Sequence, residues 1–206
     1  MNDTTPQFAL TAETASEFDF IIGLDASGSM SKPSKRFVGK TRWEEAQETI
    51  YGIAHTLNKI DADGIDIVVF GGSTDWYEGV TADKVEDLFN TRSPNGGTPL
   101  AAALTKIVAK QKTSGKNTVA IIFTDGEPDQ EPPVEKVIVD AANSLDKDEA
   151  LTFLFVQIGD DAGAAKFLAR LDDNLPAAKF DIVDTVSAAE AETMQPLDLI
   201  NKAIND

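Results

Sequence analysis

The chain has 206 residues, of which 42% are hydrophobic, and this is enough to fill the core of a single domain. Its 35 acidic and 18 basic residues give a formal charge of −17, which disfavours binding to nucleic acid or to anionic lipid, because both depend on Lys and Arg. The apolar runs are too short for insertion into a membrane, and the absence of cysteine excludes disulfides, thiolate catalysis and zinc–thiolate sites.

The first 16 residues are polar and show no clear period, so residues 1–16 are predicted to be an N-terminal tail or arm. They lack the basic and apolar segments of a secretory signal, and we therefore expect a cytoplasmic protein. Residues 17–206 are predicted to form the folded domain.

Strands and helices are predicted to alternate along this domain. Apolar runs indicate buried strands at 18–25, 65–70, 119–124, 151–158 and 179–183, with a short hairpin strand at 76–80. Helical spacing and capping residues indicate helices at 41 to about 57–60, 81–90, 99–112, 132–145, 162–171 and 188–204. Thr41 and Glu44 predict a capping box, and Thr98 is predicted to cap a helix that begins at Pro99.

The alternation predicts an α/β fold. Strands that are apolar throughout favour a doubly wound, mostly parallel sheet with helices on both faces and one short antiparallel edge strand. Ligands bind to such sheets outside the carboxyl ends of the strands.

Three polar clusters fall on that edge of the predicted sheet. Residues 25–29 read Asp-Ala-Ser-Gly-Ser and follow the first strand, residues 96–99 read Gly-Gly-Thr-Pro and precede a helix, and residues 124–126 read Thr-Asp-Gly at the end of another strand. Each cluster alone also fits ordinary strand ends or helix caps. Their coincidence on one edge favours a metal site made by five residues: Asp25, Ser27, Ser29, Thr98 and Asp125.

The donors of this predicted site are two carboxylates and three hydroxyls, which are hard oxygen ligands. Mg²⁺ fits them best, with Mn²⁺ or Ca²⁺ as alternatives. Two carboxylates held ~5 Å apart would repel each other by roughly 3 kcal/mol at an effective dielectric constant of 20, and a divalent cation offsets that repulsion. The hydroxyls are neutral, so the bound ion keeps its attraction for an outside carboxylate.

Several residues around these donors are predicted to support the site. Gly28 and Gly126 allow close turns of the backbone, and Gly97 precedes Thr98. Asp129 is interpreted as a loop residue or as a contact of the ion's ligands. Asp160 is expected on the same edge, where its charge would lower the potential near the ion.

The order Asp-x-Ser-x-Ser, a distant Thr and a distant Asp resembles the metal-ion-dependent adhesion site of von Willebrand factor A domains, over roughly residues 18–204. The resemblance implies that Ser27, Ser29 and Thr98 coordinate the ion directly, that Asp25 and Asp125 act largely through waters, and that a partner's Glu or Asp completes the shell. Residues 41–46 and 156–173 are similar to the intracellular branch, which includes bacterial tellurium-resistance-type A domains and the copines.

The sequence therefore predicts a divalent-cation-dependent protein-binding module rather than an enzyme. One alternative is a metal-responsive regulator or sensor. Another is a Mg²⁺-dependent hydrolase or phosphotransferase, but Ser27 stands where such a phosphatase would need a second Asp, and no Lys adjoins Asp125.

Overall fold

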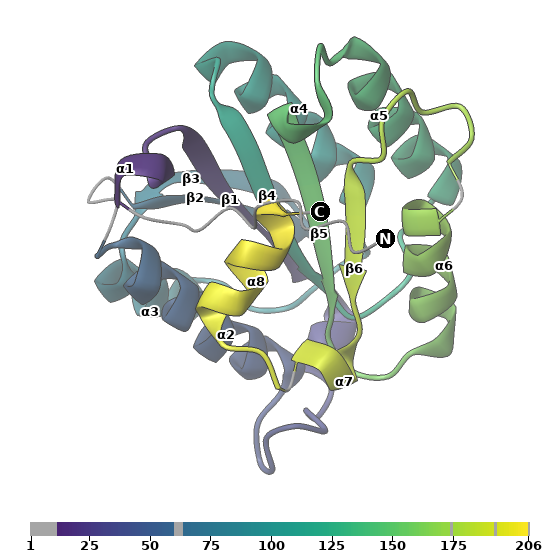
Figure 1. The fold of residues 1–206 in the computed structure, drawn as a ribbon. Helices are drawn as coiled ribbons and strands as arrows, with labels where there is room; N and C mark the ends of the chain where they lie inside the picture. Colours follow the sequence, from purple (N-terminus) through teal and green to yellow (C-terminus); the bar gives the residue numbers. More distant parts are fainter. Residues whose placement is uncertain (1–11, 60–63, 174, 192, 206) are drawn as a thin grey trace.

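The computed structural model describes residues 12–59, 64–173, 175–191 and 193–205, and its centre is a six-stranded sheet (Figure 1). The strand order is β3-β2-β1-β4-β5-β6; β3 pairs antiparallel with β2, and every other pair is parallel. The strands are β1 (Phe18–Ala26), β2 (Ile65–Gly71), β3 (Thr74–Val80), β4 (Asn117–Thr124), β5 (Leu151–Gln157) and β6 (Val183–Val186). The predicted fold class, including its antiparallel edge strand, is confirmed.

Helices cover both faces of this sheet (Figure 1). The longer ones are α2 (Arg42–Leu57), α3 (Ala82–Thr91), α4 (Leu100–Ser114), α5 (Glu131–Ser144), α6 (Ala162–Asp173) and α8 (Pro196–Ile204). The short ones are α1 (Ala12–Ala15), α7 (Ala188–Ala191), η1 (Gly28–Ser31) and η2 (Asp148–Ala150).

The sheet divides the core into two apolar layers, one on each of its faces. Buried side chains of α2, α3 and α8 pack on the face that carries Ile22 and Leu24 of β1. Buried side chains of α4, α5 and α6 pack on the opposite face, around Ile21 of β1. Successive side chains of a strand point to opposite faces, so β1 contributes to both layers and is buried on both sides.

The start of α2 is fixed as the sequence predicts. The backbone N–H of Glu44 donates to Oγ1 of Thr41 at 3.2 Å, and the N–H of Thr41 donates to Oε2 of Glu44 at 2.7 Å. These two bonds satisfy donors that the first turn of a helix leaves unpaired. The capping box is confirmed, and it sets the position of Arg42, the first residue of the helix.

Three predicted boundaries are wrong. The last strand begins at Val183 rather than at residue 179; Ile182 is buried, but the strand ladder with β5 runs from Val183 to Val186. The last helix is two helices, because α8 starts afresh at Pro196, where proline suits the first helical turn. Thr98 is not the cap of α4, because Pro99 takes that position and the helix begins at Leu100.

The strand order reverses between β1 and β4, which makes this the switch point of the sheet. From β1 the chain moves outward to β2 and β3, and from β4 it moves the other way to β5 and β6. The loops after β1 and β4 therefore diverge and leave room for a ligand between them. Asp25 lies near the end of β1, and Asp125 directly follows β4.

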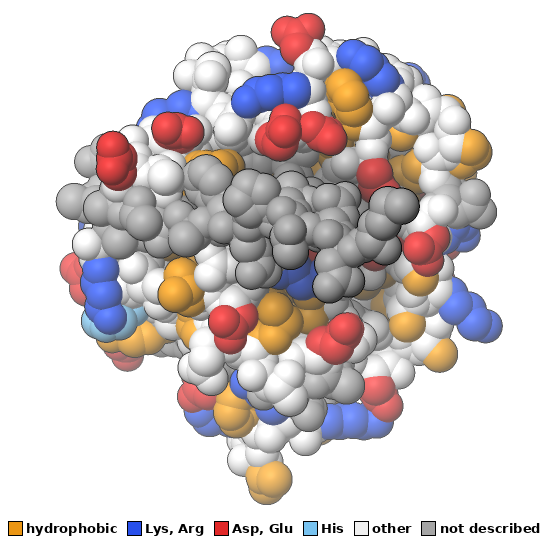
Figure 2. Space-filling view, in the orientation of Figure 1, with side chains coloured by type: hydrophobic (Ala, Val, Ile, Leu, Met, Phe, Trp, Pro, Cys, Tyr) orange, Lys and Arg blue, Asp and Glu red, His pale blue; other side chains and the backbone are white. Residues whose placement is uncertain are grey.

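Residues 1–11 of the predicted N-terminal tail lie outside the described residues, and 12–15 form α1. No helix in the described part of the chain is long and apolar enough to cross a membrane. On the face shown in Figure 2, acidic and basic side chains are interspersed over several elements.

Candidate metal centre

Asp25 is the deepest residue of the candidate site, with none of its surface exposed. Its Oδ1 accepts a hydrogen bond from the backbone N–H of Ser27 at 2.7 Å, and its Oδ2 accepts one from Oγ1 of Thr124 at 2.7 Å. The carboxylate thus joins the end of β1 to the end of β4. Groups of the protein therefore hold both of its oxygens in place.

The two predicted serines meet beside this carboxylate. Oγ of Ser27 lies 3.0 Å from Oγ of Ser29, and Oγ of Ser29 donates to Oδ1 of Asp125 at 2.6 Å. Ser27 and Asp125 are buried, and Ser29 is half-buried. Residues separated by 96 positions in the sequence therefore contribute neighbouring oxygens.

Thr98 is brought to the same edge by its loop. The N–H of Asn95 donates to the carbonyl of Ala26 at 2.7 Å, and the N–H of Gly28 donates to the carbonyl of Gly96 at 3.1 Å. These two bonds place the loop before α4 against the loop after β1. The side chain of Thr98 is buried there.

Asp129 fixes Thr98 from the other side. Its Oδ1 accepts from the N–H of Thr98 at 2.8 Å, and its own N–H donates to the carbonyl of Thr98 at 3.0 Å. A Cβ at Gly97 would lie 2.4 Å from Oδ1 of Asp129, so a side chain at Gly97 would displace this carboxylate. Asp129 therefore positions the backbone of Thr98.

Arg42 binds the remaining oxygen of Asp125. Its Nη1 donates to Oδ2 at 2.5 Å, and both side chains are largely buried. The sequence prediction did not include Arg42, which is 83 positions away from Asp125. The only local signal was its place directly after the capping residue Thr41, which says where α2 begins but not what its first side chain contacts.

Gly159 makes room for this guanidinium in the loop after β5. It has a φ of +76°, and a Cβ there would lie 2.7 Å from Cζ of Arg42. A side chain at position 159 would therefore be strained by its backbone and would also collide with Arg42. The position of the Arg42 guanidinium therefore depends on the absence of a side chain at Gly159.

The pKa of the Asp25 carboxyl is raised from 3.8 to about 6. Burial is the main cause, because it disfavours the charged form, and the charge of Asp125 acts in the same direction. Hydrogen bonds from Thr124 and Ser27 lower the pKa in part. Burial and the charge of Asp125 thus make the charged form of Asp25 unfavourable, and a nearby cation would offset that cost.

The other predicted supporting residues take different positions. A Cβ would fit at Gly28 and at Gly126, because it would make ordinary van der Waals contacts, at 3.6 Å from the Gly96 carbonyl in the first case and 3.9 Å from the Ser29 hydroxyl in the second. Asp160 is exposed and forms an ion pair with Lys35. Its hydrogen bond from Lys35 lowers the pKa of its carboxyl. No contact of Asp160 with the five predicted ligands appears among the described residues.

The donor set fits a hard divalent cation. Two carboxylates and the hydroxyls of Ser27 and Ser29 converge between the ends of β1 and β4, and Thr98 lies in the loop bonded to them. Nowhere in the described ranges do three or more His, Cys, Asp or Glu side chains form a metal-binding group. Any ion held at this edge would therefore depend on hydroxyl oxygens, which suits Mg²⁺ or Mn²⁺ with several retained waters.

The fold has well-defined relatives among solved structures. A manganese-loaded TRAP protein of Plasmodium vivax superimposes with a TM-score of 0.60 at 20% identity, over 91% of this chain and 73% of that one. A von Willebrand factor type A protein of Catenulispora acidiphila has a TM-score of 0.55 at 17% identity, over 91% of this chain and 41% of that one. The chain has the von Willebrand factor A fold.

A third structure with this fold is the von Willebrand factor domain of the type V pilus tip protein Mfa5 of Porphyromonas gingivalis. It has a TM-score of 0.51 at 13% identity, and the match covers 91% of this chain and 95% of that domain. The chain spans 30% of a pilus adhesin, SpaC of Lactobacillus rhamnosus GG, that also matches. No protein-family model and no curated protein sequence matches the chain.

Proposed function

We propose that this von Willebrand factor A fold is a divalent-cation-dependent protein-binding module, in which a partner's carboxylate completes the shell of the ion. The observation that carries the proposal is the hydroxyl of Ser29, which lies within hydrogen-bond distance of both the Ser27 hydroxyl and the Asp125 carboxylate. Hydroxyls and a carboxylate at such spacing are suited to hold one small cation between them.

The charges around the site favour an incoming anion. Asp25 and Asp125 contribute two negative charges, Arg42 contributes one positive charge, and a divalent cation adds two more. The loaded site then has a net charge of about +1. At an effective dielectric constant of 20, unit charges about 4 Å apart attract by about 4 kcal/mol, so a carboxylate would be drawn to this site.

The proposed ion is Mg²⁺, with Mn²⁺ or Ca²⁺ as substitutes, and the proposed setting is the cytoplasm. The hard oxygen donors support this choice of ions. The manganese-loaded state of the TRAP relative supports a divalent ion in this fold, although that protein is only 20% identical. Structural relatives that are pilus proteins support a protein partner.

A hydrolytic role has less support from the geometry. Asp25 has none of its surface exposed, and hydrogen bonds to both of its oxygens fix its orientation, so it is poorly placed to take a proton from a substrate water. His55, the single histidine of the chain, lies exposed on α2 with its ring 6.2 Å from that of Tyr51. A general base is therefore hard to assign among the described residues.

A random peptide library displayed on phage tests this function without a known partner. Peptides retained by the protein in Mg²⁺ and released by EDTA are expected to be enriched in Asp or Glu. Thr98→Ala, which removes one expected ligand, should lose these peptides, while the surface variant Thr105→Ala on α4 should keep them. The proposal would be overturned if EDTA does not release the peptides, or if Thr98→Ala retains them as well as wild type does.

A further inference from the structure

The loop between η1 and α2 concentrates positive charge in an acidic protein. Residues 32–40, here named the basic loop, contain Lys32, Lys35, Arg36 and Lys40 and no acidic residue, whereas the whole chain has a formal charge of −17. Figure 1 shows this loop projecting from the carboxyl edge of the sheet, at the end of the molecule that also carries the candidate metal centre.

Hydrogen bonds within the basic loop hold it in a defined shape. Pro33 and Thr41 form an antiparallel bridge, and the N–H of Ser34 donates to the carbonyl of Lys40 at 2.8 Å. Oγ of Ser34 accepts from the N–H of Phe37 at 2.8 Å and donates to Oε2 of Glu45 at 2.8 Å, which ties the loop to α2. An ordered loop presents its charges with little loss of entropy on binding.

The base of the loop is bonded directly to the residues of the site. The N–H of Lys32 donates to the carbonyl of Ser29 at 3.0 Å, and the N–H of Arg42 donates to the carbonyl of Lys32 at 3.0 Å. Lys32 thus lies between a predicted metal ligand and the arginine that binds Asp125. A peptide that reaches the ion with one carboxylate would have its neighbouring residues beside this loop.

Of the four basic side chains of the loop, two form ion pairs within the described part of the chain and two do not. Lys35 pairs with Asp160, and Lys40 pairs with Glu48. Among the described residues, no carboxylate pairs with the side chain of Lys32 or with that of Arg36, whose guanidinium lies 4.9 Å from the ring centre of Phe37.

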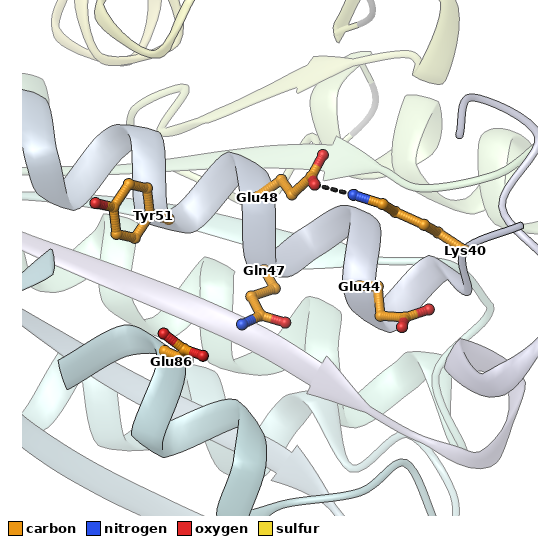
Figure 3. Close-up of a pocket in the computed structure, with 6 residues that line it drawn as sticks. All are labelled: Lys40, Glu44, Gln47, Glu48, Tyr51 and Glu86. Carbon is orange, nitrogen blue, oxygen red and sulfur yellow. Dashed lines mark hydrogen bonds and ion pairs between the residues drawn. The ribbon is translucent and has the colours of Figure 1, made fainter. Parts of the chain in front are cut away.

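An acidic groove limits the direction from which an anionic partner can approach. This groove of about 330 Å³ lies between α2 and α3, on the Lys40 side of the basic loop (Figure 3). Its lining residues are Lys40, Glu44, Gln47, Glu48, Tyr51 and Glu86. Its three carboxylates outnumber its one basic residue, Lys40, so the groove would disfavour an acidic segment.

We propose that the partner is an acidic peptide segment, with one carboxylate at the ion and further Asp or Glu side chains at Lys32 and Arg36. This inference rests on the proposed function, because it assigns the surroundings of the same partner. Val38 at the tip of the loop is fully exposed and would contact an apolar residue of that segment.

The test compares peptides selected from the random library by three forms of the full chain: wild type, Lys32→Gln/Arg36→Gln, and the matched control Lys106→Gln/Lys112→Gln, which removes two exposed charges from α4. Wild type and the control should select peptides with several acidic residues around the obligatory carboxylate. The loop variant should still select a single EDTA-sensitive carboxylate but lose the enrichment of flanking acids. A peptide selected by the wild-type protein should bind the loop variant about fivefold more weakly than it binds wild type at low salt. At 0.5 M NaCl the difference should be less than about twofold.

The two proposals fail in different ways. This inference would be overturned if wild type selects peptides that have one EDTA-sensitive carboxylate but neutral flanking residues. It would also be overturned if wild type and the loop variant select peptides with equally acidic flanks. Either result would leave the proposed function standing. Peptides without any EDTA-sensitive carboxylate would overturn both. A ten-residue oligothymidylate that binds as tightly as the peptides and with the same dependence on Lys32 and Arg36 would also overturn the assignment of a peptide partner.

Discussion

Nη1 of Arg42 lies 2.5 Å from Oδ2 of Asp125, and the ion pair is buried at the edge of the sheet where β1 and β4 end. The other oxygen of Asp125 accepts from Ser29. One carboxylate is therefore shared between a permanent internal cation and the proposed site of a divalent one. This arrangement holds Asp125 in place while it reduces the negative charge of the site by about half.

Replacing Arg42 with methionine should destabilise the metal-free protein by about 3 kcal/mol, because removal of one partner leaves a buried charge without compensation. The matched variant Lys40→Met removes an exposed ion pair with Glu48 and should lower the free energy of unfolding by less than about 1 kcal/mol. Urea unfolding in EDTA measures both.

The same Arg42→Met variant should gain more stability from Mg²⁺ than wild type does. The cation would then offset the uncompensated charge of Asp125 as well as that of Asp25. The measurement is the increase in melting temperature between EDTA and saturating Mg²⁺. A smaller increase in Arg42→Met than in wild type would contradict this role of Arg42.

Asp25 should make the metal-free protein less stable as the pH rises. Its folded pKa, about 6, is above the usual 3.8, so the folded state binds the proton more tightly than the unfolded state does. The stabilisation is full below about pH 4 and is lost as the pH rises through 6, with a total change on the order of 2 to 3 kcal/mol.

Asp25→Asn isolates this effect from the titration of the other carboxylates. In EDTA, the free energy of unfolding of wild type relative to Asp25→Asn should fall between pH 4 and pH 7, and added Mg²⁺ should reverse part of that fall at pH 7. A difference between the two proteins that is constant with pH would show that Asp25 has an ordinary pKa.

Gly159→Ala should be more destabilising than an alanine at another left-handed glycine. Both Gly159 and Gly115 have positive φ, +76° and +71°, but only at Gly159 would a Cβ approach Arg42. Gly115→Ala should lower the free energy of unfolding by about 1 kcal/mol through backbone strain, and Gly159→Ala by roughly 2 to 4 kcal/mol. If thermal or urea unfolding gives equal losses, the collision with the guanidinium is not important.

The alternation of strands and helices was sufficient to predict the edge of the sheet at which the candidate residues meet. Asp25 lies near the end of one buried apolar strand and Asp125 directly follows another, and parallel strands put their carboxyl ends on one edge. The capping box at Thr41 was also readable, because it depends on residues only three positions apart. These features are local, and the topology follows from them.

The contacts of Arg42 were beyond sequence reasoning. Its partner Asp125 lies 83 positions away, and its space depends on Gly159 in a third loop. The split of the last helix was missed for a different reason. Proline is typical of the first turn of a new helix, so Pro196 marks the start of α8 inside the range where one continuous helix is predicted.

The most direct test of the account is a calorimetric titration of Mn²⁺ into wild type, Thr98→Val and Thr105→Val. Valine removes the hydroxyl of Thr98 but keeps its backbone bonds to Asp129. We predict one Mn²⁺ per wild-type chain, affinity at least roughly tenfold weaker in Thr98→Val, and unchanged affinity in Thr105→Val. Absence of Mn²⁺ binding by wild type, or equal affinity in Thr98→Val, would contradict a cation site built on this hydroxyl.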